Sequence, residues 1–188
     1  MKHSRLILSL TVMCLLFSAI ACGSKEPVIE TPAAEMNLSA ADIGPAWSVV
    51  EEQGLDEATK SDLPHVQDAN MRVFQAEGIT GMVMSYMFTT KSIASAEKEM
   101  ATGDAVSSFR KGFQEQMPGM ALETIQPPDI GDEAVMIGGS HDELGLNVYM
   151  LTFRKANVIV MLALLGREEF ASEGAMANYA NKVKAKIH

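Results

Sequence analysis

The stretch Leu146–Leu165, which reads LNVYMLTFRKANVIVMLALL, decides the fold of this chain. Its two halves, Leu146–Arg154 and Asn157–Leu165, are rich in β-branched and large apolar residues, and Lys155-Ala156 separates them. This pattern predicts two strands joined by a tight hairpin. Because both halves are apolar on both faces, we expect them to be central strands of a sheet that helices cover.

Further strands are expected on either side of a helical region. In Gly81–Thr89, an apolar set (Met82, Met84, Tyr86 and Phe88) alternates with a mixed set, so we expect the apolar face of this strand to lie in the core. Shorter strands are expected at Trp47–Val50, Arg72–Ala76, Leu122–Ile125 and Glu133–Ile137, the last ended by Gly138-Gly139, with a loop and a helical turn over Glu51–Asn70.

Two segments have the periodicity of helices. Between Ser92, a plausible cap, and the stop signal Pro118-Gly119, apolar residues recur every three or four positions: Ile93, Ala96, Met100, Val106, Phe109, Phe113 and Met117. Gly103 weakens the middle, so this segment is either one long helix or two consecutive helices. Ser172–Ile187 is the second helical segment. The element order predicts an α+β fold, a mostly antiparallel sheet of six to seven strands packed against two main helices.

The N-terminus has the pattern of an export signal. Lys2 and Arg5 precede an apolar run over Leu6–Ala21, which is shorter than the ~20 residues of a membrane-spanning helix. The end of this run, with Ala21 before Cys22, resembles a bacterial lipobox. The resemblance implies that residues 1–21 are removed and that Cys22 carries a lipid, which would anchor the protein to a membrane. The alternative is an ordinary secretory signal that leaves Cys22 as a free thiol.

The rest of the chain divides into a tether and one domain. Residues 22–37 contain two prolines and three glutamates, so we expect a flexible tether there and a single α+β domain over 38–188, in which Ser39 and Asp42 cap a first helical turn. Without the signal, the chain has a net charge of about −11 and no thiol besides Cys22. The charge argues against a nucleic-acid partner, and the cysteine content excludes a disulfide or a thiolate metal site in the domain.

No catalytic or metal-binding constellation is evident. Ser140, His141 and Asp142 are consecutive and cannot form a triad from separate elements, so we interpret them as a turn. The acidic residues of the loops lack calcium-binding spacing, and the histidines show no metal-ligand spacing. The acidic residues are Asp129, Asp132, Glu133, Asp142 and Glu143. The histidines are His65, His141 and His188. The arginines Arg72, Arg110, Arg154 and Arg167 are scattered and predict no anion-binding cluster. We therefore expect no cofactor and no enzymatic activity.

Methionine is the compositional exception, with 14 residues in the chain. Met82 and Met84 lie on one strand face, as a Cu(I) site would require, but core filling explains them without a metal. Flexible thioethers would also suit a pocket for varied apolar ligands.

Three segments carry a resemblance to a family: LSAADIGPAW from Leu38, PPDIGDEAVMI from Pro127, and VYMLTFRKANVIVMLALLG from Val148. With the closing helix, they resemble a broad group of bacterial surface lipoproteins, including sensor-like extracellular domains and domains with a PsbP-like α/β sandwich. The resemblance implies no catalytic residues. We expect a non-catalytic domain, lipid-anchored in the bacterial cell envelope and exposed outside the cytoplasm, that binds a ligand or an envelope protein. The alternative is a carrier of an apolar small molecule or lipid in a methionine-lined cavity.

Overall fold

The computed structural model of this chain describes residues 27–78, 81–117 and 119–188. The predicted export signal and the predicted lipid site at Cys22 lie outside these residues. Within the described part of the chain, no helix combines the length and the apolar character needed to cross a membrane.

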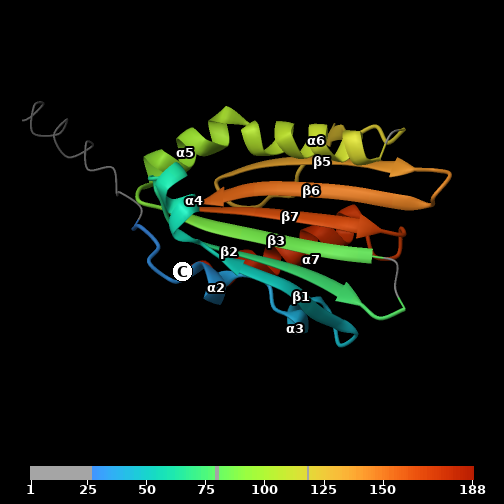
Figure 1. The fold of residues 1–188 in the computed structure, drawn as a ribbon, viewed down its shortest axis with the longest axis horizontal. Coiled ribbons are helices and arrows are strands. Elements are labelled where there is room, and N and C mark those ends of the chain that lie inside the picture. Colours follow the sequence, from blue (N-terminus) through green and yellow to red (C-terminus); the bar gives the residue numbers. More distant parts are fainter. Residues whose placement is uncertain (1–26, 79–80, 118) are drawn as a thin grey trace, which may run out of the picture.

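The sheet has seven strands, all paired antiparallel, in the order β1-β2-β3-β7-β6-β5-β4 (Figure 1). The strands are β1 (Trp47–Gly54), β2 (Val66–Ala76), β3 (Gly81–Thr90), β4 (Glu123–Ile125), β5 (Glu133–His141), β6 (Leu146–Lys155) and β7 (Val158–Gly166). The expected hairpin is confirmed, since β6 and β7 pair in the interior of the sheet. Its two-residue turn is Ala156-Asn157, where Ala156 has a φ of 53°.

Helices cover both faces of this sheet, which confirms the α+β class. Helices α5 (Ile93–Thr102) and α6 (Asp104–Gln116) lie on one face, and α7 (Glu173–Lys184) lies on the opposite face (Figure 1). The short helices α2 (Ala33–Met36) and α3 (Ala40–Ile43) pack on the α7 side, and α4 (Glu57–Asp62) links β1 to β2. Gly103 joins α5 to α6 in the left-handed region, with a φ of 63°. Of the two possibilities for this segment, two consecutive helices is therefore correct.

The predicted boundaries of the Glu51–Asn70 loop and of strand β5, which were based on glycine and polar residues, are wrong. The helical turn expected within Glu51–Asn70 is present as α4, but the rest of this expected loop includes the end of β1 and the start of β2. Strand β5 continues through Gly138-Gly139 to His141 instead of ending there, and the turn follows at 142–145. A Cβ on Gly139 would lie 2.1 Å from the carbonyl oxygen of Ala121, so this glycine permits a close approach of two backbones.

Both faces of β3 pack against hydrophobic clusters, but the mixed face is the more completely buried one, which the alternation did not predict. Its mixed face, which includes Val83, Ser85 and Met87, is buried on the α7 side. Its apolar face points toward α5 and α6, where Met84 and Tyr86 are only half-buried. Ser85 tolerates burial because its hydroxyl is hydrogen-bonded to the side chain of Asn37. The more apolar face of this strand is therefore the less completely covered one.

The N-terminal segment (residues 27–38) is part of the domain, and the prediction of a tether up to residue 37 is wrong for it. Met36 and Leu38 are fully buried in the core on the α7 side. The side chain of Asn37 is 1 % exposed, and its Nδ2 donates to the backbone oxygen and to Oδ1 of Asn70, at 3.0 and 2.7 Å. Farther upstream, the N–H of Ile29 donates to Asn157 Oδ1 at 2.6 Å. These contacts fix the segment across the sheet.

Candidate functional site

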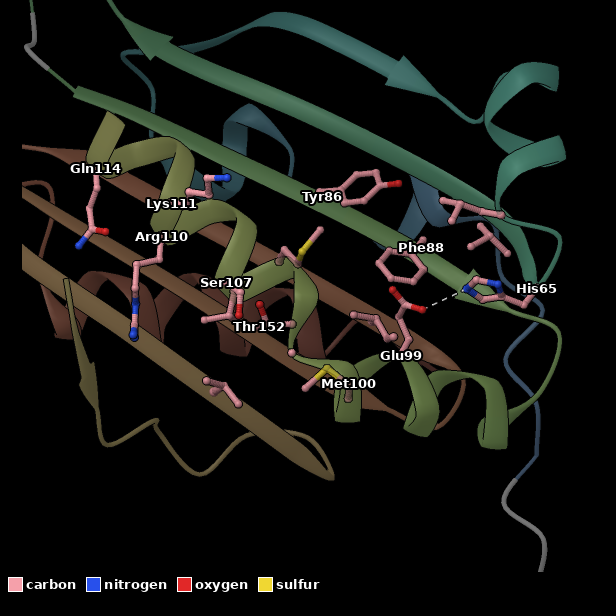
Figure 2. Close-up of a pocket in the computed structure, with 17 residues that line it drawn as sticks. His65, Tyr86, Phe88, Glu99, Met100, Ser107, Arg110, Lys111, Gln114 and Thr152 are labelled. Atoms are coloured by element: carbon pink, nitrogen blue, oxygen red, sulfur yellow. Dashed lines mark ion pairs between the residues drawn. The ribbon is translucent and has the colours of Figure 1, made fainter. Parts of the chain in front are cut away.

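A cavity of about 520 Å³ lies between the α5–α6 helices and the sheet (Figure 2). We call it the helix-side cavity. Its sheet floor includes Tyr86, Phe88 and Met161, and its helical wall includes Met100 and Val106. The remaining lining residues are Leu63, His65, Val66, Glu99, Gly103, Ser107, Arg110, Lys111, Gln114, Val135, Thr152 and Ile159. The cavity thus combines an apolar floor with a few polar groups, which is the usual composition of a small-molecule site.

A second hollow, of about 250 Å³, adjoins the first, and we call it the methionine compartment. Tyr86 and Met161 line both spaces. The compartment is lined by four methionines and four other side chains: Met71, Met84, Met150, Met161, Tyr86, Phe109, Leu162 and Ala163. These methionines come from four strands, so their thioethers gather only through the sheet pairing.

The register of the sheet accounts for the shape of the floor. One cross-strand row runs from Thr152 on β6 through Met161 on β7 and Tyr86 on β3 to Met71 on β2. The next row places Ala163 between Met84 and Met150. Directly opposed residues on one face of an antiparallel sheet have neighbouring side chains, so the small Ala163 leaves a gap between two long methionines. That gap contributes to the methionine compartment.

An ion pair closes one end of the helix-side cavity. His65 Nε2, at the loop before β2, lies 3.2 Å from Glu99 Oε2 on α5 (Figure 2). Both side chains are about one-third exposed, at 34 % and 36 %. Ser92, whose hydroxyl accepts a hydrogen bond from the Ser95 N–H, caps α5 and sets the start of the helix that carries Glu99.

The α6 side of the same cavity presents cations. Arg110, Lys111 and Gln114 line it from α6, within slightly more than one helical turn (Figure 2). Among the ion pairs of the described residues, none includes Arg110 or Lys111. The guanidinium of Arg110 makes one long hydrogen bond, 3.4 Å from Nη2 to Thr124 Oγ1. The cavity therefore has positive charge that no described carboxylate neutralises.

Two buried polar atoms in this cavity lack a hydrogen-bond partner. They are Nε of Arg110 and Oγ1 of Thr152, which is 4 % exposed. In the described chain, only one other buried side-chain atom, Nε of Arg154, is in this condition. Buried polar groups are nearly always paired, so two unpaired atoms in one cavity indicate that a partner is absent.

Tyr86 occupies the boundary between the two spaces. Burial raises the pKa of its hydroxyl above the ordinary 10.0, so the phenol stays protonated at physiological pH. Its ring lies 5.6 Å from that of Phe88, centroid to centroid, with a 39° tilt. The Tyr86 side chain thus presents an apolar ring face and a neutral hydroxyl at the boundary between the helix-side cavity and the methionine compartment.

The structure separates the residues that sequence analysis singled out. His65 lies at the cavity, whereas Ser140 and His141 form the end of β5 and not the expected turn, and the Ser140 hydroxyl is 3.4 Å from Asp142 Oδ1. Within the described residues, no group of three or more His, Cys, Asp or Glu side chains is placed to hold a metal ion.

The four arginines have different environments. Arg72 lies 2.7 Å from Glu52, and Arg154 is buried with Asp132 at 3.0 Å, while Arg167 is exposed. Arg110 is the arginine of this set that reaches the cavity. Sequence analysis missed it because the cavity arises from several distant elements. One available signal was a basic residue next to Phe109, on the apolar stripe of an otherwise core-facing helix.

Comparison with known proteins supports the fold and little else. No protein-family description matches the chain, and no curated protein matches it. The extracellular domain of PknH from Mycobacterium tuberculosis is similar in structure, with a TM-score of 0.61 and 11 % sequence identity, over 87 % of this chain and 98 % of that one. A putative uncharacterised protein from Mycobacterium smegmatis has a TM-score of 0.42 and 12 % identity, over 78 % of this chain and 92 % of that one. At this identity, the likeness to the PknH domain concerns the fold alone.

Proposed function

We propose that this chain is a non-catalytic binding domain that carries an apolar small molecule between the sheet and helices α5 and α6. The observation that carries the proposal is the pair of adjoining spaces, of about 520 and 250 Å³, over a floor of methionine and aromatic side chains. Small-molecule sites have volumes of roughly 300–1,000 Å³ and mostly apolar linings with a few polar groups. A thioether-rich floor can adapt to ligands of different shapes.

The proposal that the domain is not an enzyme rests on the arrangement of polar groups at the cavity. Nucleophilic catalysis needs a base within hydrogen-bond reach of a nucleophile. Among the described interactions of His65, the side chain has Glu99 as its partner and no hydroxyl. The other histidine considered from the sequence, His141, does not line the cavity.

The proposed location follows from the N-terminal pattern. We propose that the signal is removed before Cys22 and that lipid on this residue anchors the domain to a bacterial membrane, outside the cytoplasm. The name of one structural neighbour, an extracellular domain of PknH, is compatible with such a location. A cell-envelope protein remains the alternative partner, and the acidic charge argues against nucleic acid.

Mass spectrometry tests the carrier function. The protein from residue 22 onward, with Cys22→Ser to prevent lipidation, is purified from bacterial cells without detergent. We expect native spectra to exceed denaturing spectra by the mass of one retained apolar molecule. The matched control is Ala163→Leu, which fills the methionine compartment and should reduce retention. A native mass equal to the denatured mass, together with no binding of added apolar compounds, would overturn the proposal.

Acyl labelling tests the anchor separately. In cells given a labelled fatty acid, Cys22→Ala should abolish both labelling and membrane retention, and Cys14→Ala should have no effect on either. Unchanged labelling of Cys22→Ala would exclude a lipid at this position.

The His65–Glu99 pair favours a second candidate function, acid–base chemistry on a molecule in the cavity. A histidine held by a carboxylate is the pair that such chemistry uses. If the bound molecule recovered from His65→Gln is chemically different from that of the unaltered protein, the second candidate is correct and the carrier function is incomplete.

A further inference from the structure

We propose that the ligand of this domain is a single-tailed anionic amphiphile. Its head would bind Arg110, and its tail would cross the sheet floor past Thr152 into the methionine compartment. This inference rests on the proposed function and names the chemical class of the ligand. It applies to a carboxylate or a phosphate head, because both offer anionic acceptor oxygens.

The head position follows from the unpaired atoms of the cavity. Arg110 Nε can only donate a hydrogen bond, and Thr152 Oγ1 can donate or accept one. Only an acceptor satisfies Nε, and an anionic head supplies acceptor oxygens together with the charge that pairs with the guanidinium. No described carboxylate forms an ion pair with Arg110, so a ligand must supply the negative charge if this half-buried guanidinium is to be neutralised.

The wall of the helix-side cavity is positively charged, although the chain as a whole is negatively charged. The chain has a net charge of −9, so a cationic cavity wall does not follow from its composition. Lys111 adds a second positive group to the same wall. A cationic head would be repelled there, and a neutral head would leave the guanidinium without a counter-charge. At the opposite end of the cavity, Glu99 already pairs with His65 and is not a free site for a cationic head.

The tail position follows from the sheet register. From Thr152, the cross-strand row continues through Met161 and Tyr86 to Met71, and these last three side chains line the methionine compartment. This row crosses four strands, and three strand spacings amount to roughly 14 Å. A saturated alkyl chain of medium length can follow such a row. The flanking gap at Ala163 leaves space for its end.

Calorimetric titration with four compounds that share a dodecyl-type tail tests the inference. Dodecanoate, dodecyl phosphate, dodecanol and dodecyltrimethylammonium are titrated into the protein from residue 22 onward with Cys22→Ser. We expect at least one anion to bind about tenfold tighter than dodecanol, because a hydrogen bond to a charged group exceeds a neutral one. The ammonium compound should bind most weakly. The ratio between dodecanoate and dodecyl phosphate distinguishes a carboxylate from a phosphate head.

Variants locate the head. Arg110→Met keeps the length and apolar character of the side-chain stem, so it should reduce anion affinity to about that of dodecanol and leave dodecanol unchanged. Arg110→Lys should restore part of the preference because it retains the charge. Arg167→Met removes an exposed arginine outside the cavity and should change none of the four affinities. Circular dichroism establishes that each variant is folded.

The outcomes separate this inference from the proposed function. If dodecanoate, dodecyl phosphate and dodecanol bind equally, and Arg110→Met affects none of them, the anionic head is wrong and the apolar carrier function stands. If none of the four compounds binds, this inference fails, and the comparison of native and denaturing mass spectra decides the proposed function. If the anions lose affinity equally in Arg110→Met and Arg167→Met, attraction by the whole protein explains the preference and the inference is overturned.

Discussion

The two faces of the sheet are built from similar side chains but differ in how closely these side chains are packed. On the α7 side, large residues such as Phe74, Leu151 and Phe153 are completely buried, and the N-terminal segment fills the remaining space. On the α5–α6 side, methionines and Tyr86 are half-buried under helices that leave about 520 Å³ open. The same sheet thus has one face closed by packing and one face left hollow.

The difference shows how stability and binding can be divided within one small domain. Close packing and satisfied polar groups on the α7 side supply the free energy of folding. The opposite face retains unpaired polar atoms at Arg110 and Thr152, which oppose folding and favour a ligand. Binding sites commonly carry such a cost in stability.

The largest expected effect is a difference between two phenylalanines. Phe153→Ala, on the α7 side, should lower the free energy of unfolding by roughly 3–5 kcal/mol, because a fully buried ring leaves a cavity in close packing. Phe109→Ala, at the methionine compartment, should cost roughly 1–2 kcal/mol, because its half-buried ring loses less area. Urea denaturation measures both values. Equal losses would contradict the contrast between the faces.

A smaller effect is expected at the buried polar cluster on the α7 side. Asn37→Ala should lower the free energy of unfolding by about 1–3 kcal/mol, because it leaves buried acceptors on Asn70 and Ser85 without donors. Asn178→Ala, on the exposed side of α7, is the control and should change little. Thermal denaturation compares the two. If Asn37→Ala were as harmless as the control, the N-terminal segment would contribute no stability through its polar contacts.

Two buried threonines on the α5–α6 face, Thr152 and Thr90, should respond in opposite directions to substitution by valine. In the absence of ligand, Thr152→Val should raise the free energy of unfolding by up to about 1 kcal/mol, because it removes an unpaired buried hydroxyl. Thr90→Val should lower it by about 1 kcal/mol, since Thr90 Oγ1 donates to the Ser92 oxygen at 2.7 Å. Chemical denaturation of the apo protein gives the sign of each change. A loss of stability in Thr152→Val would mean that its hydroxyl is satisfied.

The smallest effect concerns pH and the α7 side. Burial is the largest single influence on the Asp42 carboxyl and opposes ionisation, yet hydrogen bonds from Lys186 and Ser39 together outweigh it and hold its pKa below the ordinary 3.8. A pKa lowered by folding stabilises the folded state above the unfolded value, and this contribution is lost as pH falls through the folded value. The pair is partly exposed, so we expect less than about 1 kcal/mol.

Asp42→Asn isolates this contribution. The free energy of unfolding of the unaltered protein should exceed that of the variant at neutral pH, and the difference should shrink at about pH 3, where the unfolded carboxyl is protonated. Denaturation curves at both values measure it. Dodecanol affinity should not change, because Asp42 lies on the closed face. A difference that grows on acidification would reverse the sign of the linkage.

The strands and helices were predictable where one pattern was long enough to dominate. The β6–β7 hairpin followed from twenty residues of nearly continuous apolar sequence, and α7 from its regular spacing and its cap at Ser172. The N-terminal segment was not predictable in this way. Its buried residues, including Met36 and Leu38, stand among prolines and glutamates, and a four-residue helix is too short to show a period.

The cavity could not be predicted from sequence periodicity, because its size depends on how closely distant helices pack on the sheet. The apolar alternation of β3 identified a face, but burial depends on how closely helices from elsewhere in the chain approach that face. Ser85 is buried because Asn37 reaches it, from a segment 48 positions away. Arg110 and Thr152 are 42 positions apart and lie at one cavity through the packing of α6 on the sheet. Their relation exists only in the folded chain.

The N-terminal segment also has a consequence for how the protein is made. The last residues of the chain hold it in place: Lys186 Nζ donates to the Asn37 oxygen at 2.9 Å, and Thr31 Oγ1 donates to the His188 oxygen at 3.2 Å. During synthesis, residues 27–38 emerge long before Lys186 and His188, so these contacts can form only late. Contacts between such distant positions slow folding. The closed face can therefore be completed only after Lys186 and His188 have been synthesised, and every earlier folding intermediate lacks these two contacts.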